Sequence, residues 1–172
     1  MRRFASARLM VTPVASPSGD PGSCALLVRD LPEILSEPVL RHLPEALQWR
    51  SAQADLRAWI EQLSDGSDVF RIDDAVNGRL VGLLIIARMS EDAAADWHLG
   101  YLFAETAWGR GFATELLQAL VTVCRDMDPR PARLVGGVGR DNPASARVLT
   151  KAGFLPAADL STQTTDMFVL TL

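Results

Sequence analysis

The segment LGYLFAETAWGRGFATELLQAL, residues 99–120, constrains the fold more than any other part of the chain. Residues 97–103 are aromatic and favour a strand, and the run is too short for a typical helix. A turn with two glycines follows at 108–113. From Phe112 the apolar residues recur at three- and four-residue spacing, which indicates a helix. The sequence therefore predicts a strand, a glycine turn and a helix in direct succession.

The turn has the properties of a phosphate site. Gly109 and Gly111 permit backbone angles that are closed to other residues, and they leave no side chain to block a ligand. A helix start also offers unpaired N–H groups and the positive end of the helix dipole. The turn has no Gly-Lys-Ser/Thr ending and no third glycine in Rossmann spacing, so two better-known phosphate loops are excluded. Ordinary loop packing is the alternative interpretation.

A second motif follows about thirty residues later. Residues 133–138 form a β-like run, and DNPASARVLTKAGF follows at 141–154. Asp141 or Asn142 can cap a short helix there, and Gly153 supplies its C-terminal stop.

The two motifs together resemble the GNAT superfamily of acyl-CoA-dependent N-acetyltransferases. The matching segments are WGRGFATE, DNPAS and KAGF. More narrowly, the chain is similar to the branch that includes the ribosomal-protein N-terminal acetyltransferases. That branch tends to open with an Arg-Leu strand leading to a proline, and residues 8–13, RLMVTP, fit this pattern. The resemblance covers nearly the whole chain, weakly over 15–65 and strongly over 97–154.

The remaining segments predict one α/β (α+β) domain over residues 1–172. We expect a mixed, mainly antiparallel twisted sheet flanked by helices, with the strand–turn–helix binding phosphate. Residues 25–31 fit a strand or a helix equally well. The other expected elements are a loop at 15–23, short helical pieces broken by Pro32, Pro38 and Pro44, a helix at 52–63 capped by Ser51, strands at 69–72 and 80–86 joined through Asn77-Gly78, a loop at 88–96 and a last strand at 164–172.

Composition excludes several other classes of protein. The chain has 172 residues, 48% of them hydrophobic, which suffices for one domain with a sizeable core. Its net charge of −4 argues against a general nucleic-acid binder. Cys24 and Cys124 provide neither a disulfide framework nor a zinc site, and no metal ligands cluster. We find no apolar run long enough for a membrane and no signal core, and we expect a cytoplasmic protein.

The resemblance implies an acetyl-CoA site. The backbone amides that would hold the pyrophosphate belong to Gly109, Arg110, Gly111, Phe112, Ala113 and Thr114. Leu102 and Phe103 would run alongside the pantetheine arm, and Asn142 would contact the pantetheine or acyl portion. Arg110 is also a candidate for adding charge beside a phosphate, with an ordinary exposed arginine as the alternative.

The chemistry implied is direct acyl transfer from a thioester to an amine, without a covalent enzyme intermediate. The amine attacks only when neutral, so it must lose a proton. The oxyanion needs a hydrogen-bond donor, and the leaving thiolate needs a proton. Many members of the superfamily use a tyrosine as the acid, but here the matching position is Leu149, and the single tyrosine of the chain is Tyr101.

Ser145 and His98 are the candidate catalytic residues. Ser145 lies one helical turn beyond Asn142 and is a candidate donor to the thioester sulfur or carbonyl, or a serine that bonds only to its own helix. Histidine in general is suited to proton transfer near neutrality, which makes His98 a candidate base. Strand alternation places Asp96 and His98 on one face, where His98 would act as base through a water, assisted by Asp96. The alternative is a packed or surface histidine.

We therefore predict an enzyme that moves an acetyl group from acetyl-CoA directly to a primary amine. The resemblance to this branch implies a protein N-terminal amine as the acceptor. We expect the protein to be a monomer or a homodimer. A small-molecule amine, such as a polyamine or an antibiotic, is one alternative acceptor. A catalytically inactive acyl-CoA sensor is another reading, which the missing tyrosine permits, and a purely structural interaction protein would leave the glycine turn unexplained.

Overall fold

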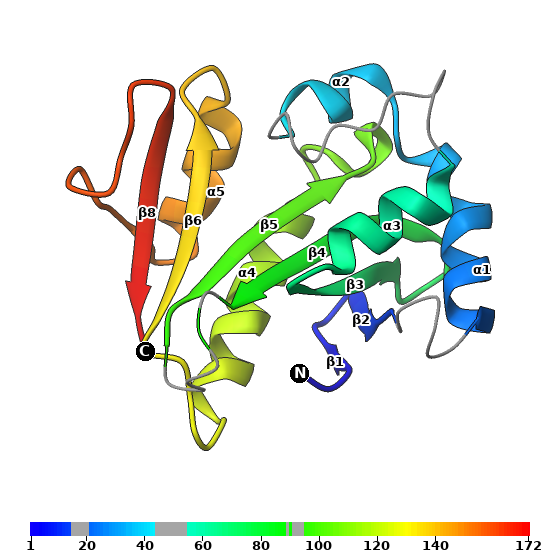
Figure 1. The fold of residues 1–172 in the computed structure, drawn as a ribbon, viewed down its shortest axis with the longest axis horizontal. Helices are drawn as coiled ribbons and strands as arrows, with labels where there is room; N and C mark the ends of the chain where they lie inside the picture. The colour runs from blue at the N-terminus through cyan, green and yellow to red at the C-terminus, as the bar shows by residue number, and fades with distance from the viewer. Residues whose placement is uncertain (15–20, 44–54, 89, 91–94) are drawn as a thin grey trace. The chain divides into compact units, whose positions relative to one another are not determined.

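The computed structural model describes residues 1–14, 21–43, 55–88, 90 and 95–172 (Figure 1). Pro44, Ser51 and parts of the expected loops at 15–23 and 88–96 lie outside these residues. The strands are β1 (Phe4–Ala5), β2 (Leu9–Pro13), β3 (Ser67–Asp74), β4 (Leu80–Arg88), β5 (Trp97–Phe103), β6 (Arg133–Gly139), β7 (Leu155–Pro156) and β8 (Thr165–Thr171). The helices are α1 (Pro21–Asp30), α2 (Glu37–Arg41), α3 (Leu56–Ser64), α4 (Phe112–Arg125) and α5 (Pro143–Lys151), with short 3-10 turns η1 (Leu31–Glu33) and η3 (Glu105–Ala107).

The strands form a mixed, mainly antiparallel sheet, as predicted. Their hydrogen-bonded order is β1-β2-β3-β4-β5-β6-β8-β7. β1 with β2, β2 with β3, β6 with β8 and β7 with β8 are antiparallel, whereas β5 and β6 are parallel. The parallel ladder consists of three pairs, Trp97 with Leu134, His98 with Val135 and Leu99 with Gly136. The ladder therefore ends while both strands continue.

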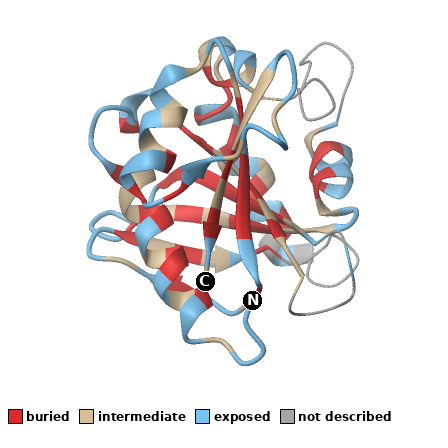
Figure 2. Ribbon diagram, turned by 90° about the vertical axis from the view of Figure 1, so that its left-hand side faces the viewer, coloured by how far each residue is buried: buried red, intermediate tan, exposed pale blue. Residues whose placement is uncertain are grey.

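The chain divides into two compact units. The first comprises 1–85 and 101–110, and the second comprises 86–100 and 111–172, within the described ranges. In both units the strands are largely buried and the helices have one buried and one exposed side (Figure 2). This pattern is typical of amphipathic helices that cover an apolar sheet.

In the first unit, α1 settles the ambiguity over residues 25–31 in favour of a helix. Cys24 and Leu27 are buried, and their three-residue spacing places them on one face of α1, while Leu31, also buried, begins the 3-10 turn η1. The expected helix at 52–63 begins later, at Leu56, and its N-cap is Asp55 and not the predicted Ser51, with the Asp55 carboxylate accepting from the Arg57 N–H at 2.9 Å. Trp59, Ile60 and Leu63 of this helix are buried.

The predicted Asn77-Gly78 hairpin joins β3 to β4. The Asp74 N–H donates to the Arg79 carbonyl at 2.9 Å, and the Gly78 N–H donates to the Asp74 carbonyl at 2.8 Å. Gly78 has a left-handed φ of 68°, which is why a glycine ends this loop. The strand after it, β4, is almost wholly buried and internal to the strand order.

In the second unit, α4 buries the predicted apolar face and α5 lies against β6. The buried residues of α4 are Phe112, Leu116, Leu117, Leu120, Val121 and Cys124. On α5, Leu149 packs against the bare backbone of Gly136, where an added Cβ would lie 3.1–3.2 Å from the leucine methyl groups. Both cysteines of the chain are free and buried, and burial raises the pKa of the Cys124 thiol to about 12.

A charged network fastens α1 to β3 in the first unit. The Arg71 guanidinium donates to the Asp73 carboxylate at 2.6–3.1 Å and to Asp30 at 3.3 Å. Asp30 also accepts from Arg29 at 2.6 Å. Hydrogen bonding to Arg29, with a further contribution from Arg71, lowers the pKa of Asp30 despite its partial burial. Removal of Arg71 would leave two partly buried carboxylates with fewer donors.

We expect Arg71→Met to lower the free energy of unfolding by about 2 kcal/mol at pH 7, because hydrogen bonds to charged groups are lost. The pKa of Asp30 is depressed in the folded state, so its stabilising effect holds above the unfolded pKa and disappears as pH falls through the folded value. The difference between wild type and variant in urea unfolding should therefore shrink below about pH 4.

The matched control is Arg79→Met, which removes a highly exposed pair with Glu33. An exposed pair contributes little, so this variant should lose less than about 0.5 kcal/mol. Equal losses in the two variants would contradict the assigned role of Arg71.

Candidate active site

The glycine turn before α4 has the backbone that the sequence predicts. Gly109 and Gly111 have left-handed φ values of 71° and 79°. Gly111 is the N-cap of α4, and its carbonyl accepts from the Glu115 N–H at 3.0 Å. As a glycine, it has no side chain that could accept from the first-turn amides, which most helices satisfy with a capping oxygen. A Cβ added to Gly109 would have no heavy atom within 4 Å, so the turn is open at that point.

The strand leading into the turn is fixed by contacts at its C-terminal end. Leu102 and Phe103 are buried, so a ligand beside them would meet mainly their backbone. Gly82 on β4 lies against them, since a Cβ there would collide with the Leu102 carbonyl oxygen and approach the Phe103 ring at 3.0 Å. The Trp108 indole N–H donates to the Phe103 carbonyl at 2.8 Å and ties the turn to the strand end.

Arg110 is half exposed, and its guanidinium lies toward the β3–β4 hairpin. Its Nη2 is 3.7 Å from Oδ2 of Asp74, a buried carboxylate. No local sequence pattern connects these two residues, because they are 36 positions apart. Aspartate before a glycine turn is ordinary turn chemistry, so sequence reasoning did not single out Asp74 as part of the site.

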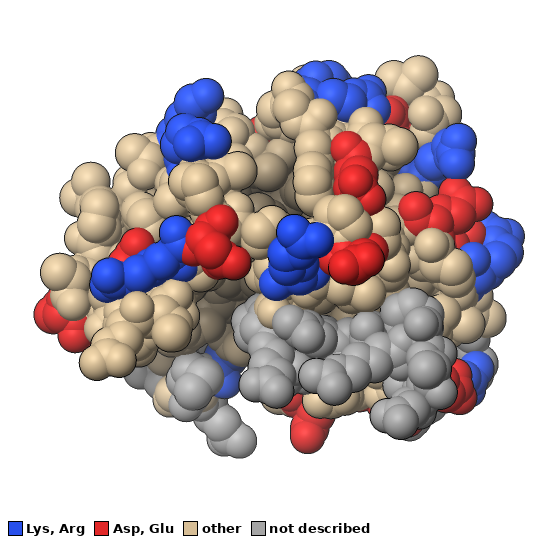
Figure 3. Space-filling view, turned by 90° about the horizontal axis from the view of Figure 1, so that it is seen from above, with Lys and Arg blue, Asp and Glu red and all other residues tan. Residues whose placement is uncertain are grey.

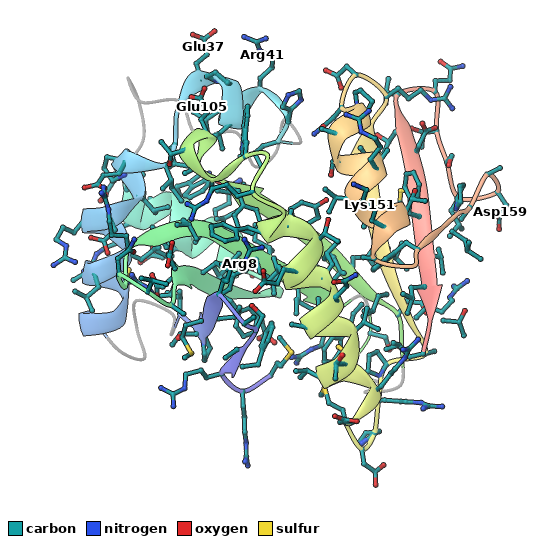
Figure 4. The ribbon with its side chains drawn as sticks, turned by 180° about the vertical axis from the view of Figure 1, so that it is seen from behind. Arg8, Glu37, Arg41, Glu105, Lys151 and Asp159 are labelled. Carbon is teal, nitrogen blue, oxygen red and sulfur yellow. The ribbon has the colours of Figure 1, made fainter. Side chains whose placement is uncertain are left out.

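Immediately before the turn, Glu105 lies beside α2. Its carboxylate accepts a hydrogen bond from the Ser36 hydroxyl, the N-cap residue of α2. Glu37 and Arg41, an exposed pair on the same helix, lie at the same end of the first unit (Figure 4). These contacts connect the chain after β5 to the part of the sequence with the weakest motif signal.

In the second unit, Asn142 caps α5 as predicted. Its side-chain oxygen accepts from the Ser145 N–H at 3.1 Å, and its own N–H donates to the Gly139 carbonyl at 2.8 Å. Both residues are half-buried. The cap therefore brings together Asn142 and Ser145, the two candidate site residues of the second motif. The contact uses the backbone N–H of Ser145 and not its hydroxyl. Leu149, in the position of the superfamily tyrosine, is 1% exposed and part of the packing of α5 on β6.

His98 faces away from α5. Residues paired in a parallel ladder share a face, and successive residues alternate. Leu99 pairs with Gly136, whose side-chain direction points at Leu149 of α5, so His98 and Val135 occupy the opposite face. His98 is half-buried there.

Asp96, the residue expected to assist His98, is hydrogen-bonded to Arg133. Its carboxylate accepts from the Arg133 Nε at 3.0 and 3.1 Å, and no hydrogen bond joins it to His98 among the described residues. The guanidinium fork matches a carboxylate better than one ring nitrogen does. Hydrogen bonding to Arg133 lowers the pKa of Asp96, and the nearby imidazole contributes least.

In this chain an open glycine turn precedes α4, and an asparagine caps the start of α5. A known family matches the chain over both features. A family model described as an acetyltransferase (GNAT) domain matches residues 26–155. The chain belongs to the GNAT acetyltransferase family. It is an acetyl-CoA-dependent acetyltransferase, and the family match supports N-acetylation as its reaction.

Solved GNAT structures share this fold over nearly their whole length. The ribosomal-protein-S5-alanine acetyltransferase from Vibrio fischeri is 11% identical, with a TM-score of 0.72, and covers 99% of this chain and 97% of its own. The ribosomal L7/L12 α-N-protein acetyltransferase RimL, solved with coenzyme A, is 16% identical, with a TM-score of 0.72 and coverages of 98% and 97%. The SpeG spermidine N-acetyltransferase from Vibrio cholerae is 12% identical, with a TM-score of 0.68 and coverages of 96% and 94%.

No curated protein matches the chain in sequence. Within the described ranges, no three His, Cys, Asp or Glu side chains form a group that could hold a metal ion. Among the helices of the described residues, none is both long and apolar enough to cross a membrane.

Proposed function

We propose that this GNAT enzyme transfers the acetyl group of acetyl-CoA to the N-terminal amine of a protein. The observation that carries the cofactor part of the proposal is the glycine turn, where helix-start amides lack a capping side chain. In this proposal the backbone of 109–114 holds the pyrophosphate. The pantetheine arm runs along Leu102 and Phe103, on the part of β5 beyond its three-pair ladder with β6, and Asn142 contacts the pantetheine or acyl portion.

Two considerations support a protein N-terminus as the acceptor. The sequence resembles the ribosomal-protein branch, and two of the structural neighbours are ribosomal-protein acetyltransferases by their names. The spermidine enzyme among the neighbours favours a polyamine as the second candidate. A polyamine carries several positive charges and is best recognised by a strongly acidic surface. The face seen in Figure 3 instead mixes Lys and Arg with Asp and Glu, and the net charge is only −4.

The proposed reaction is one displacement at the thioester carbonyl. The neutral amine nitrogen forms a bond to the carbonyl carbon, the carbonyl becomes an oxyanion, and the carbon–sulfur bond then breaks. The amine loses one proton and the CoA thiolate gains one. His98 is the candidate base, acting through a water, and Ser145 is the candidate donor to the thioester sulfur or carbonyl. The pairing of Asp96 with Arg133 leaves His98 to act without that carboxylate.

Calorimetric titration with acetyl-CoA tests the cofactor site. We expect micromolar binding by wild type and loss of binding in Gly111→Val, because a branched side chain is strained at a left-handed φ and blocks the amides. Gly66→Val is the matched control, since Gly66 has a similar φ of 73° in the turn before β3. A folded wild type that does not bind acetyl-CoA, or a Gly111→Val variant that still binds as tightly as wild type, would contradict the proposed site.

Ser145→Ala tests the hydroxyl alone. The cap uses the Ser145 N–H, so alanine retains it. We expect kcat to fall about tenfold with little change in the acetyl-CoA KM, as for loss of one transition-state hydrogen bond. The acceptor for this assay is identified first, by testing a panel of peptides with free N-terminal amines and, separately, spermidine. Thr150→Ala on the same helix, where the hydroxyl donates to the Ala146 carbonyl at 3.0 Å, should leave kcat unchanged. Unchanged turnover in Ser145→Ala would remove the assignment.

His98→Gln tests the base. A titrating base produces an acidic limb in the pH profile of kcat/KM, and we expect the variant to lose that limb and to be at least tenfold slower at neutral pH. His42→Gln, at the exposed end of α2, is the matched control. Identical pH profiles for wild type and His98→Gln would mean that the proton goes elsewhere.

A further inference from the structure

We propose that Asp74, on the β3–β4 hairpin, is a positioning residue that orients Arg110 toward the phosphates of acetyl-CoA. The inference rests on the proposed cofactor site at 109–114. It adds a residue that lies far from the two sequence motifs and touches the cofactor only through the arginine.

Asp74 is a rigid anchor. Its backbone is fixed by the Arg79 carbonyl and the Gly78 N–H, at 2.9 and 2.8 Å, and it pairs with Leu9 in the β2–β3 ladder. Its Oδ1 accepts from the Val76 N–H at 2.9 Å. The side chain is 7% exposed. The hairpin thus holds the backbone of Asp74 and its Oδ1. Because the carboxylate is planar and rigid, holding Oδ1 also fixes the orientation of Oδ2.

That second oxygen faces Arg110. The distance from Arg110 Nη2 to Asp74 Oδ2 is 3.7 Å, and half of the arginine side chain is exposed. Burial of a carboxylate is costly unless a cation is nearby, which accounts for an arginine at this position. The exposed half of Arg110 leaves room for an anionic ligand to approach.

Arg110 lies between two glycines in left-handed conformations, and half of its side chain is exposed. A long side chain loses rotamer freedom when it is ordered on a phosphate. An ion pair to a rigid carboxylate restricts the rotamers in advance, so less freedom is lost when the ligand binds.

A purely electrostatic role for Asp74 predicts the opposite effect. A carboxylate beside an anion site repels the anion, so its removal would tighten the binding of acetyl-CoA. The sign of the change in affinity therefore distinguishes positioning from simple repulsion.

Calorimetry with acetyl-CoA on wild type, Asp74→Asn, Arg110→Gln and the double variant provides the test. Asparagine keeps an oxygen for the Val76 N–H and removes only the charge, and Asp74→Ser is a second variant with the same ability. We expect Asp74→Asn to weaken the Kd three- to fivefold, within the range of a partly exposed ion pair. In the Arg110→Gln background, the same change should have no effect.

Each outcome has a distinct meaning. A wild type that does not bind acetyl-CoA overturns the proposed cofactor site. A wild type that binds, with unchanged or tighter binding in Asp74→Asn, overturns only the positioning role, as does an equal loss with and without Arg110. Melting temperatures of the unliganded variants supply the control, because a general loss of structure would weaken binding in both backgrounds.

Discussion

The left-handed backbone at Gly109 and Gly111 is the constraint on which the rest of the active site depends. It shapes the last residues before α4, which follow β5 and the 3-10 turn η3. A residue with a Cβ adopts these angles only at a cost. The N-cap of α4, Gly111, has no side chain that could accept from the first-turn amides, and this is the feature on which the proposed pyrophosphate site rests.

Much of the fold could be predicted because its determinants are local. The apolar residues of α4 recur within a few positions of one another, and all of those predicted to be buried are buried. Asn142 caps α5 through a contact three residues away, and Asn77-Gly78 closes its hairpin within six residues. The roles of Ser145 and His98 in catalysis remain predictions.

The remaining parts depend on contacts between distant residues. Asp74 and Arg110 are separated by the whole of β4 and β5, and Asp96 meets Arg133 only after α4 has returned the chain to the sheet. No periodicity encodes such pairs. Residues 25–31 are ambiguous for a different reason. A short apolar run fits the periodicity of a helix and that of a strand, and only the flanking residues distinguish them. Here the helix begins earlier, at Pro21.

The contact between Leu149 and Gly136 has an evolutionary consequence. A tyrosine at 149 would bring a ring into a position where the leucine methyl groups already lie against bare backbone. Overpacking of this kind is itself destabilising, so a lineage starting from this chain would have to remodel the α5–β6 packing before it could gain a tyrosine acid there. Packing of α5 on β6, as well as the reaction, therefore restricts which side chains position 149 can hold.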